Sequence, residues 1–318
     1  MLLRKRAHQF IKHGHREQVA IAMMISIASG KGGTGKTTIA VNLALSLPKG
    51  NAQLIDCDVE EPNSHIFLSP SIHQVTSMGI PVPRIDESKC TYCGKCATVC
   101  EYHAIAVILK NVLVFDELCH GCGACSYLCP EKAIFEVKRE IGIVQEGSAD
   151  GVSFVNGVLN IGEPMASPLI RKTKEKIQKE KIVILDAPPG TACPVIETVK
   201  GSDFCLLVTE PTPFGLNDLE LAVGLLEKLG IPKGVVVNKA DVGDREVWDY
   251  CQSKNMPILM EIPMDRRIAE SYSKGVPIVV EYPSYMQGFK DLFGKVEKLH
   301  ESNRRRTGIE RRDWLSRL

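Results

Sequence analysis

The sequence lacks an apolar run long enough to cross a membrane. A spanning helix needs roughly 20 apolar residues, and the only candidate, residues 19–28 (VAIAMMISIA), is much shorter. A basic stretch precedes it, as in a secretory signal. Because the run leads directly into a glycine-rich loop, we interpret it as a buried parallel strand instead. These features predict a soluble, cytoplasmic protein whose 318 residues form one large domain and a smaller one.

The sequence also lacks a strong charge excess, since its formal net charge is only +1. Basic residues concentrate at the two ends, and residues 301–318 hold six arginines. Such ends are either solvated or contact nucleic acid or anionic lipid. The apolar residues of the C-terminal stretch form no amphipathic stripe, so we expect no membrane contact. The charge pattern gives no strong signal for nucleic-acid binding.

From Met23 onward, short apolar runs alternate with helical stretches. This alternation predicts an α/β fold with a mostly parallel sheet, which places ligands at the carboxyl ends of its strands. The expected strands are residues 22–28, 53–57, 181–186, 204–209, 234–238 and 257–261. The expected helices are residues 36–47, 166–180, 214–229, 243–254 and 286–300.

The first expected strand is followed by SGKGGTGKTT, residues 29–38, and then by a helix. This stretch fits the phosphate-binding P-loop pattern, in which backbone amides surround the phosphates of a nucleotide. Lys36 is expected to reach the β- and γ-phosphates, and the Thr37 hydroxyl to bind Mg²⁺. The predicted nucleotide-binding residues of the loop are Gly30, Lys31, Gly32, Gly33, Thr34, Gly35, Lys36, Thr37 and Thr38.

Cysteine is unusually frequent for a cytoplasmic protein, with 12 residues, and disulfides are an improbable use for it there. Eight of these cysteines form two C-x2-C-x2-C-x3-C motifs, each followed at the same offset by Ala-Ile. The motifs start at Cys90 and Cys119, so residues 84–140 contain a duplicated unit inserted into the larger domain. Residues 142–165 are expected to return the chain to the sheet as a β-hairpin.

The spacing of both motifs is typical of iron-sulfur clusters, in which three close cysteines hold one cubane and the fourth binds the other. The insert resembles a bacterial two-cluster ferredoxin over nearly its full length. One departure is Glu101, which stands where the family usually has proline, as Pro130 does in the second motif. Zinc is the alternative metal, although its four-cysteine sites usually separate two C-x2-C pairs by a longer loop. The resemblance implies two [4Fe-4S] clusters, one bound by Cys90, Cys93, Cys96 and Cys129, the other by Cys119, Cys122, Cys125 and Cys100.

The P-loop carries a second lysine, Lys31, in the form G-K-G-G-x-G-K-T-T. This is the deviant Walker A signature, and from Met23 to about residue 295 the chain resembles the MinD, Mrp and nitrogenase iron protein class of ATPases. The resemblance implies that Lys31 contacts the phosphates bound by the other subunit, as an arginine finger would. It therefore implies a homodimer on ATP binding, or a heterodimer with a related ATPase. The alternative is a solvated loop lysine.

Two aspartates follow at places that match the same class. Asp58 lies just after an expected strand, where the resemblance implies the residue that orients or deprotonates the attacking water. Asp186 begins D-A-P-P-G, which looks like the Mrp-type switch II, and is implied to hold the Mg²⁺ shell. Each aspartate alone could instead be a turn residue or helix cap.

The base of the nucleotide is less well defined by the sequence. Residues 238–241 (NKAD) match the guanine-binding N-K-x-D motif of GTPases. Relatives of the resembled class use an asparagine at this strand end for adenine, so the resemblance favours ATP and assigns Asn238 to the base.

We therefore divide the chain into a basic N-terminal extension (1–22), the first part of the ATPase (23–83), the ferredoxin-like insert (84–140), the second part of the ATPase (141–300) and a basic C-terminal tail (301–318). The leading hypothesis is an ATPase in which nucleotide-controlled dimerisation gates electron transfer through the clusters to a redox partner protein. We expect its hydrolysis to be slow without that partner. The alternatives are a cluster carrier or assembly factor and a MinD-like positioning ATPase. The C-terminal C-x-x-C of Mrp-type carriers is missing.

Overall fold

The computed structural model describes residues 23–307. The predicted N-terminal extension, residues 1–22, therefore lies outside the described residues, as do residues 308–318 of the predicted C-terminal tail. Residues 301–307 continue the last helix, α11. Within the described range, no helix combines the length and apolar character needed to cross a bilayer.

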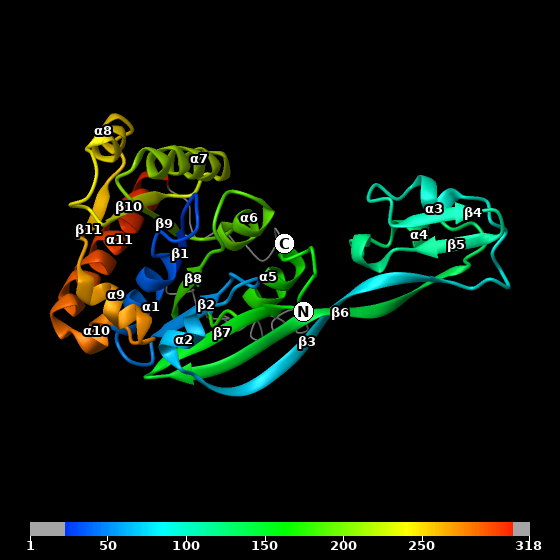
Figure 1. Cartoon of the computed structure of the whole chain (residues 1–318), viewed down its shortest axis with the longest axis horizontal. Helices are drawn as coiled ribbons and strands as arrows, with labels where there is room; N and C mark the ends of the chain where they lie inside the picture. The colour runs from blue at the N-terminus through cyan, green and yellow to red at the C-terminus, as the bar shows by residue number, and fades with distance from the viewer. Residues whose placement is uncertain (1–22, 308–318) are drawn as a thin grey trace, which may run out of the picture.

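A nine-stranded sheet in the order β11-β10-β9-β1-β8-β2-β7-β6-β3 forms the centre of the molecule (Figure 1). The first seven strands of this order are parallel, and β6 and β3 are added antiparallel at one edge. This confirms the predicted α/β fold with a mostly parallel sheet. The strands are β1 Met23–Ala28, β2 Ala52–Asp56, β3 Ser71–Ile85, β6 Ile134–Ala149, β7 Val152–Leu159, β8 Ile182–Asp186, β9 Phe204–Thr209, β10 Lys233–Asn238 and β11 Ile258–Ile262.

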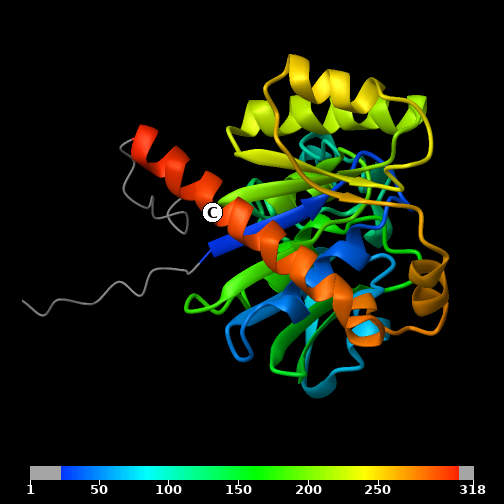
Figure 2. The same cartoon turned by 90° about the vertical axis from the view of Figure 1, so that its left-hand side faces the viewer.

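Helices cover both faces of the sheet, which explains why every residue of β1 is buried (Figures 1 and 2). Ile25 and Ile27 of β1 pack with helices α1, α10 and α11 on one face. Met24 and Ala28 point to the other face, where α5, α6, α7 and α8 lie. The longer helices are α1 Lys36–Ser46, α5 Ser167–Lys174, α6 Cys193–Val199, α7 Pro213–Leu229, α8 Glu246–Ser253, α9 Arg266–Ser273 and α11 Met286–Thr307; α2 Ser64–Leu68 and α10 Ile278–Glu281 are short.

All six predicted strands and all five predicted helices are present, with some changed ends. The helix predicted for residues 166–180 ends at Lys174, because the following turn is held by β2: Gln53 donates from Nε2 to the Lys176 carbonyl and accepts from the Gln178 amide. The helix predicted to start at residue 243 starts at Glu246, whose amide donates to the Asp244 carboxylate.

The two long strands β3 and β6 form an arm that leaves the body of the molecule (Figure 1). The expected hairpin is present as β6 and β7, which turn at Asp150 and Gly151, both at positive φ (49° and 84°), as a tight Asp-Gly turn requires. At Ile141 the pairing of β6 with β3 shifts by one residue, and this bulge marks the point where the arm leaves the sheet. Beyond it, seven residues of β3 extend the arm by about 20 Å.

A small cysteine-rich module, residues 86–133, sits at the end of the arm (Figure 1). It contains the two-stranded sheet β4 Ile105–Ile108 and β5 Asn111–Val114, and the four-residue helices α3 Lys95–Thr98 and α4 Ala124–Tyr127. Each helix follows a left-handed glycine, Gly94 or Gly123, at the same place in the two motifs. The internal repeat of the sequence is therefore a repeat of structure.

Candidate functional site: a phosphate-binding loop and two cysteine hollows

The loop of residues 29–35 joins β1 to α1 at the carboxyl edge of the sheet. Gly33 and Gly35 adopt left-handed φ values of 78° and 96°. A Cβ atom on Gly30 would lie 2.2 Å from the Asp218 carbonyl oxygen of α7, and one on Gly35 would lie 2.8 Å from Asn238 Nδ2. Backbone conformation therefore favours glycine at positions 33 and 35, and close neighbours leave no room for a side chain at positions 30 and 35.

Lys36 is the first residue of α1, and its side chain folds back over the loop. Its ammonium donates to the Lys31 carbonyl at 3.5 Å, and the residue is only 6% exposed. Burial lowers the pKa of Lys36, while the nearby Asp186 and Asp58 carboxylates act in the opposite direction. A buried ammonium facing two carboxylates at a glycine-rich loop is well placed for a phosphate.

Three aspartates meet beside the loop, at the carboxyl ends of β2 and β8. Burial raises the pKa of Asp58 to about 7 and that of Asp186 to about 8, and the carboxylate of Asp56 adds to both effects. Asp56 is fully buried and accepts from the amides of Asp58, Asn63 and Ser64. Our sequence reasoning gave Asp56 no role, although its place at the strand end could have indicated one. It shapes the turn that carries Asp58.

The raised pKa of Asp58 predicts a pH-dependent stability. Because the folded protein holds this proton more tightly than the unfolded chain, stability is lost as pH rises from about 4 to about 7. We expect Asp58→Asn to raise the Tm of the nucleotide-free protein by about 3 °C at pH 8 and by less at pH 5. Calorimetry with a metal chelator present measures the two Tm changes, and an equal gain at both pH values would contradict the prediction.

If Asp58 activates water, Asp58→Asn slows hydrolysis by about 100-fold or more.

Two buried oxygen atoms at the loop have no hydrogen-bond partner: Thr34 Oγ1 and Asp186 Oδ1. The Thr37 hydroxyl and Ser64 Oγ both interact with the Asp186 carboxylate, Ser64 at 3.2 Å from Oδ2. A hard cation takes oxygen ligands from hydroxyls, carboxylates and phosphates. The residues present therefore fit the predicted Mg²⁺ position, with Thr37 and Asp186 as its neighbours.

Asn238 ends β10 and supports the loop. Its Nδ2 donates to the Thr34 carbonyl at 2.9 Å, and its Oδ1 accepts from the Lys239 amide. Both polar ends of the Asn238 side chain thus form hydrogen bonds within the protein. The residue lies beside the phosphate-binding loop, and the sequence predicted that it binds the base of the nucleotide.

Lys31 points away from its own loop in the single chain. Its ammonium lies 3.9 Å from Glu210 Oε2, and its side chain is one-third exposed. The other oxygen of Glu210 pairs with Lys239 Nζ at 2.7 Å. Lys31 is thus at the surface and weakly held, where a partner subunit could reach it.

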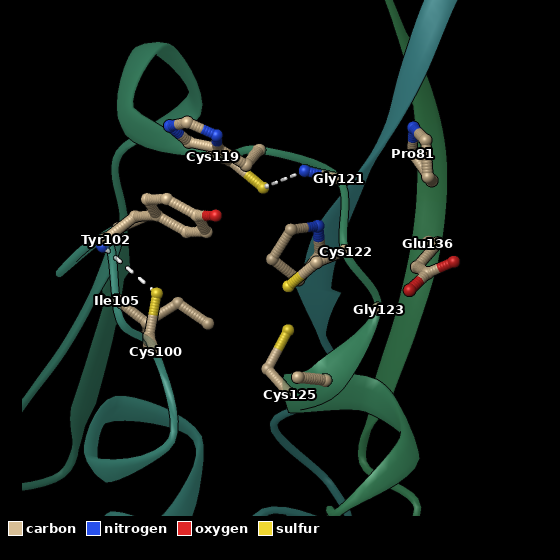
Figure 3. Close-up of a pocket in the computed structure, with 14 residues that line it drawn as sticks. Pro81, Cys100, Tyr102, Ile105, Cys119, Gly121, Cys122, Gly123, Cys125 and Glu136 are labelled. Carbon is tan, nitrogen blue, oxygen red and sulfur yellow. Dashed lines mark hydrogen bonds between the residues drawn. The ribbon is translucent and has the colours of Figure 1, made fainter. Parts of the chain in front are cut away.

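In the module, the eight cysteines separate into two sets that line two different hollows. The first hollow, of about 370 Å³, is lined by Cys90, Cys93, Cys96 and Cys129. The second, of about 380 Å³, is lined by Cys100, Cys119, Cys122 and Cys125 (Figure 3). Each hollow thus takes three cysteines from one motif and the fourth from the other, the grouping expected from the ferredoxin resemblance.

Backbone amides point at the sulfurs of the fourth cysteines. The Ala104 amide donates to Cys100 Sγ and the Ala133 amide to Cys129 Sγ, both at 3.3 Å. The alanine that follows both motifs at the same offset thus makes the same contact in both halves of the repeat. In the second hollow Gly121 also donates to Cys119 Sγ, at 3.5 Å (Figure 3). Amides directed at cysteine sulfur are suited to ligands of an iron-sulfur cluster.

The four sulfurs of each set surround a hollow rather than converge on one point. Among residues 23–307, no three cysteine, histidine or carboxylate side chains come close enough together to hold a single metal ion. A zinc ion would draw four sulfurs to about 2.3 Å from one centre. The donor set and its spread fit a multi-atom cluster.

The four remaining cysteines lie in the body. Cys205 is fully buried in the core, and Cys57 and Cys251 are buried as well. Cys193 is exposed at the start of α6, seven residues after Asp186.

The parallel sheet, the glycine loop with its buried lysine and the adjoining aspartates define a P-loop nucleotide-binding protein. The family model described as the CobQ/CobB/MinD/ParA nucleotide binding domain matches residues 25–278. The chain belongs to this family, as the deviant Walker A signature predicted.

Two proteins are similar to this chain in sequence, and one solved structure is similar to it in fold. An uncharacterized protein of Methanocaldococcus jannaschii is 33% identical over 80% of this chain and 90% of its own length. A protein of Pyrococcus horikoshii named iron-sulfur cluster carrier protein is 26% identical over 87% of this chain and 86% of its own length. The septum site-determining protein MinD of Pyrococcus horikoshii, solved with Mg-ADP, has a TM-score of 0.55 and 22% identity, covering 87% of this chain and 96% of that one. The last likeness shows the fold.

Proposed function

We propose that this protein is an ATPase whose nucleotide state controls a two-cluster electron-transfer module. The proposal rests on one observation: two four-cysteine hollows sit on an arm that starts after Asp58 and returns before Asp186. Both aspartates border the phosphate-binding loop. The module is therefore attached between the two segments that a nucleotide would move.

At the nucleotide site, the loop amides and Lys36 bind the phosphates, and Thr37 and Asp186 orient the Mg²⁺ that accompanies ATP. Asp58 positions the attacking water and accepts its proton, for which a pKa of about 7 is suitable. Lys31 leaves Glu210 and supplies positive charge to the phosphates of a second subunit. Nucleotide binding and dimer closure then become one event.

In the module, the two cysteine sets would each hold a [4Fe-4S] cluster. These clusters would supply one-electron transfer between a redox partner protein and an acceptor. The chain itself ligates them through eight thiolates and directs amides at three of the sulfurs.

A mechanical connection links the nucleotide site to the module. Ser64, the first residue of α2, contacts Asp186 through its hydroxyl and Asp56 through its amide. Helix α2 is followed after two residues by β3 of the arm. Movement of Asp186 on binding Mg²⁺ would therefore reach the start of β3, within the sheet and before the bulge at which the arm leaves it.

Apolar packing continues this connection along the arm. One buried cluster includes body residues of β2 and β8, then Ile80 and Val82 of β3, then Ala104 and Cys119 of the module. Arg139 of β6 also forms an ion pair with the nearly buried Glu163 of the body. A packed, continuous element of this kind transmits a displacement rather than absorbing it.

Anaerobic purification followed by iron and sulfide analysis tests the metal content. We expect about eight iron and eight sulfide per chain. A colourless, iron-free protein purified under strict exclusion of oxygen would refute the electron-transfer function, and zinc in its place would support a purely structural module.

A second candidate function, cluster delivery, is favoured by the relatives named iron-sulfur cluster carrier protein. Against it, each set supplies four cysteines, so a bound cluster has no open position through which to leave. Incubation of the loaded protein with an apo-ferredoxin distinguishes the two. We expect transfer no faster than iron loss to a chelator; faster transfer would favour the carrier.

A further inference from the structure

The two cysteine hollows differ at several equivalent wall positions, although the motifs share their spacing, and two of these positions bring together residues from opposite halves of the repeat. The residue after the first cysteine of each motif is Thr91 in the first and His120 in the second. The residue two places after the fourth cysteine is Tyr102 in the first motif and Glu131 in the second. Because the fourth cysteines exchange between the sets, Thr91 and Glu131 both line the first hollow, whereas His120 and Tyr102 both line the second.

In the second hollow these two side chains form a stacked pair. The rings of Tyr102 and His120 are nearly parallel, with an interplanar angle of 7° and centroids 3.5 Å apart. The two residues come from the two halves of the repeat, so their stack closes the seam between the halves. Figure 3 shows the Tyr102 ring beside the sulfurs of Cys100 and Cys119. The corresponding hydroxyl and carboxylate of the first hollow cannot stack in this way, and the aromatic residue that lines that hollow, Tyr92, belongs to the first motif alone.

The burial of the first cysteine of each motif follows this difference, whereas the second cysteines, Cys93 and Cys122, are both exposed. Cys119 is 8% exposed, whereas its counterpart Cys90 is only half-buried. Tyr102 itself is 44% exposed, so the ring faces water on its outer side and the hollow on its inner side. An aromatic ring presents a large apolar surface to what lies beneath it.

The second hollow is also the one nearer to the ATPase body. It is lined by Pro81 and Pro83 of β3, whereas the first hollow meets the arm at its far end, Ile85 and Ile134. The buried apolar cluster that starts in the body reaches Cys119. The second hollow therefore lies on the side of the ATPase body, and the first hollow lies at the tip of the arm.

We propose that Tyr102 and His120 are positioning residues that shield the second cluster site from water and small solutes, so that the two cluster sites are unequal. The distal site, walled by Thr91 and Glu131, is then the one exposed to a redox partner. This inference rests on the proposed function, because it assumes that both hollows hold clusters.

The experiment measures the loss of visible cluster absorbance after the anaerobic protein is mixed with air-saturated buffer. We expect two phases of equal amplitude in the unaltered protein. Tyr102→Leu should accelerate the slow phase roughly tenfold, because solvent exposure is a main determinant of cluster behaviour. Tyr102→Phe, which keeps the ring, should preserve the slow phase, and Glu131→Leu, the matched change at the first hollow, should leave it unchanged.

The iron content of each variant is measured first, and about eight iron per chain shows that both clusters have assembled. If Tyr102→Leu holds less iron, His120→Thr becomes the deciding variant. It introduces the residue found at the equivalent position of the first motif, and we expect it to accelerate the slow phase to the same extent. A single phase in the unaltered protein, or equal effects of Tyr102→Leu and Glu131→Leu, would overturn the inference. If both clusters are present but bleach in one phase, this inference fails and the proposed function stands. If no clusters are present, the inference and the proposed function both fail.

Discussion

Replacing Lys31 by alanine is expected to abolish ATP-dependent dimerisation and to slow hydrolysis by about 1000-fold, the scale of a lost arginine finger. The reason is that the Lys31 ammonium lies at the surface beside Glu210, while only its backbone carbonyl contacts Lys36 of the loop. Under the proposed function, its charge serves the phosphates of a second subunit. Light scattering and a phosphate-release assay, each with and without ATP, measure the two effects.

Lys36→Ala is the matched control for this prediction. Lys36 is buried at the loop and faces the phosphate position, so its loss should prevent nucleotide binding altogether. Lys31→Ala should keep binding within a few-fold, since no binding contact is removed from the single chain. If Lys31→Ala dimerised and hydrolysed ATP normally, the lysine would be a solvated loop residue and the trans role would be lost.

Two neighbouring cysteines of one motif are expected to affect different clusters. Cys96 lines the first hollow and Cys100 the second, although only three residues separate them. Replacement of either by alanine should lower iron from about eight to about four per chain. In Cys100→Ala the remaining cluster should be the fast-bleaching one, and in Cys96→Ala the slow-bleaching one.

The same pair of variants tests the exchange of ligands between the motifs. If each motif instead held its own cluster, both variants would lose the same cluster and leave the same residual spectrum by electron paramagnetic resonance. That result would contradict the grouping of the sulfurs in the structure. Cys251→Ala, a core cysteine far along the chain, is the control and should keep the full iron content.

Much of the framework could be predicted because its signals are local. The central strands are buried on both faces, so they appear as continuous apolar runs such as MMISIA of β1. The loop is recognisable because phosphate binding requires a fixed order of glycine and lysine. The cysteine spacing likewise reflects short-range geometry, and the ferredoxin resemblance that it carries implied the two sets of cysteines that line the two hollows.

The arm could not be predicted in the same way. The first half of β3 is largely exposed, and its outer half contains Pro81 and Pro83, both unfavourable to a strand in the interior of a sheet. They are accommodated because β3 is the edge strand. The stack of Tyr102 on His120 and the pairing of Lys31 with Glu210 join residues far apart in the sequence, and neither residue type signals its partner.

The central claim is that nucleotide state at the loop changes the behaviour of the module at the end of the arm. The most direct measurement is the rate at which reduced methyl viologen reduces the clusters, in stopped flow, with ADP or with a non-hydrolysable ATP analogue. We expect rates that differ by about fivefold or more between the two nucleotides, and no difference in Lys31→Ala. Equal rates in the unaltered protein, with both clusters present and the analogue bound, would contradict the coupling.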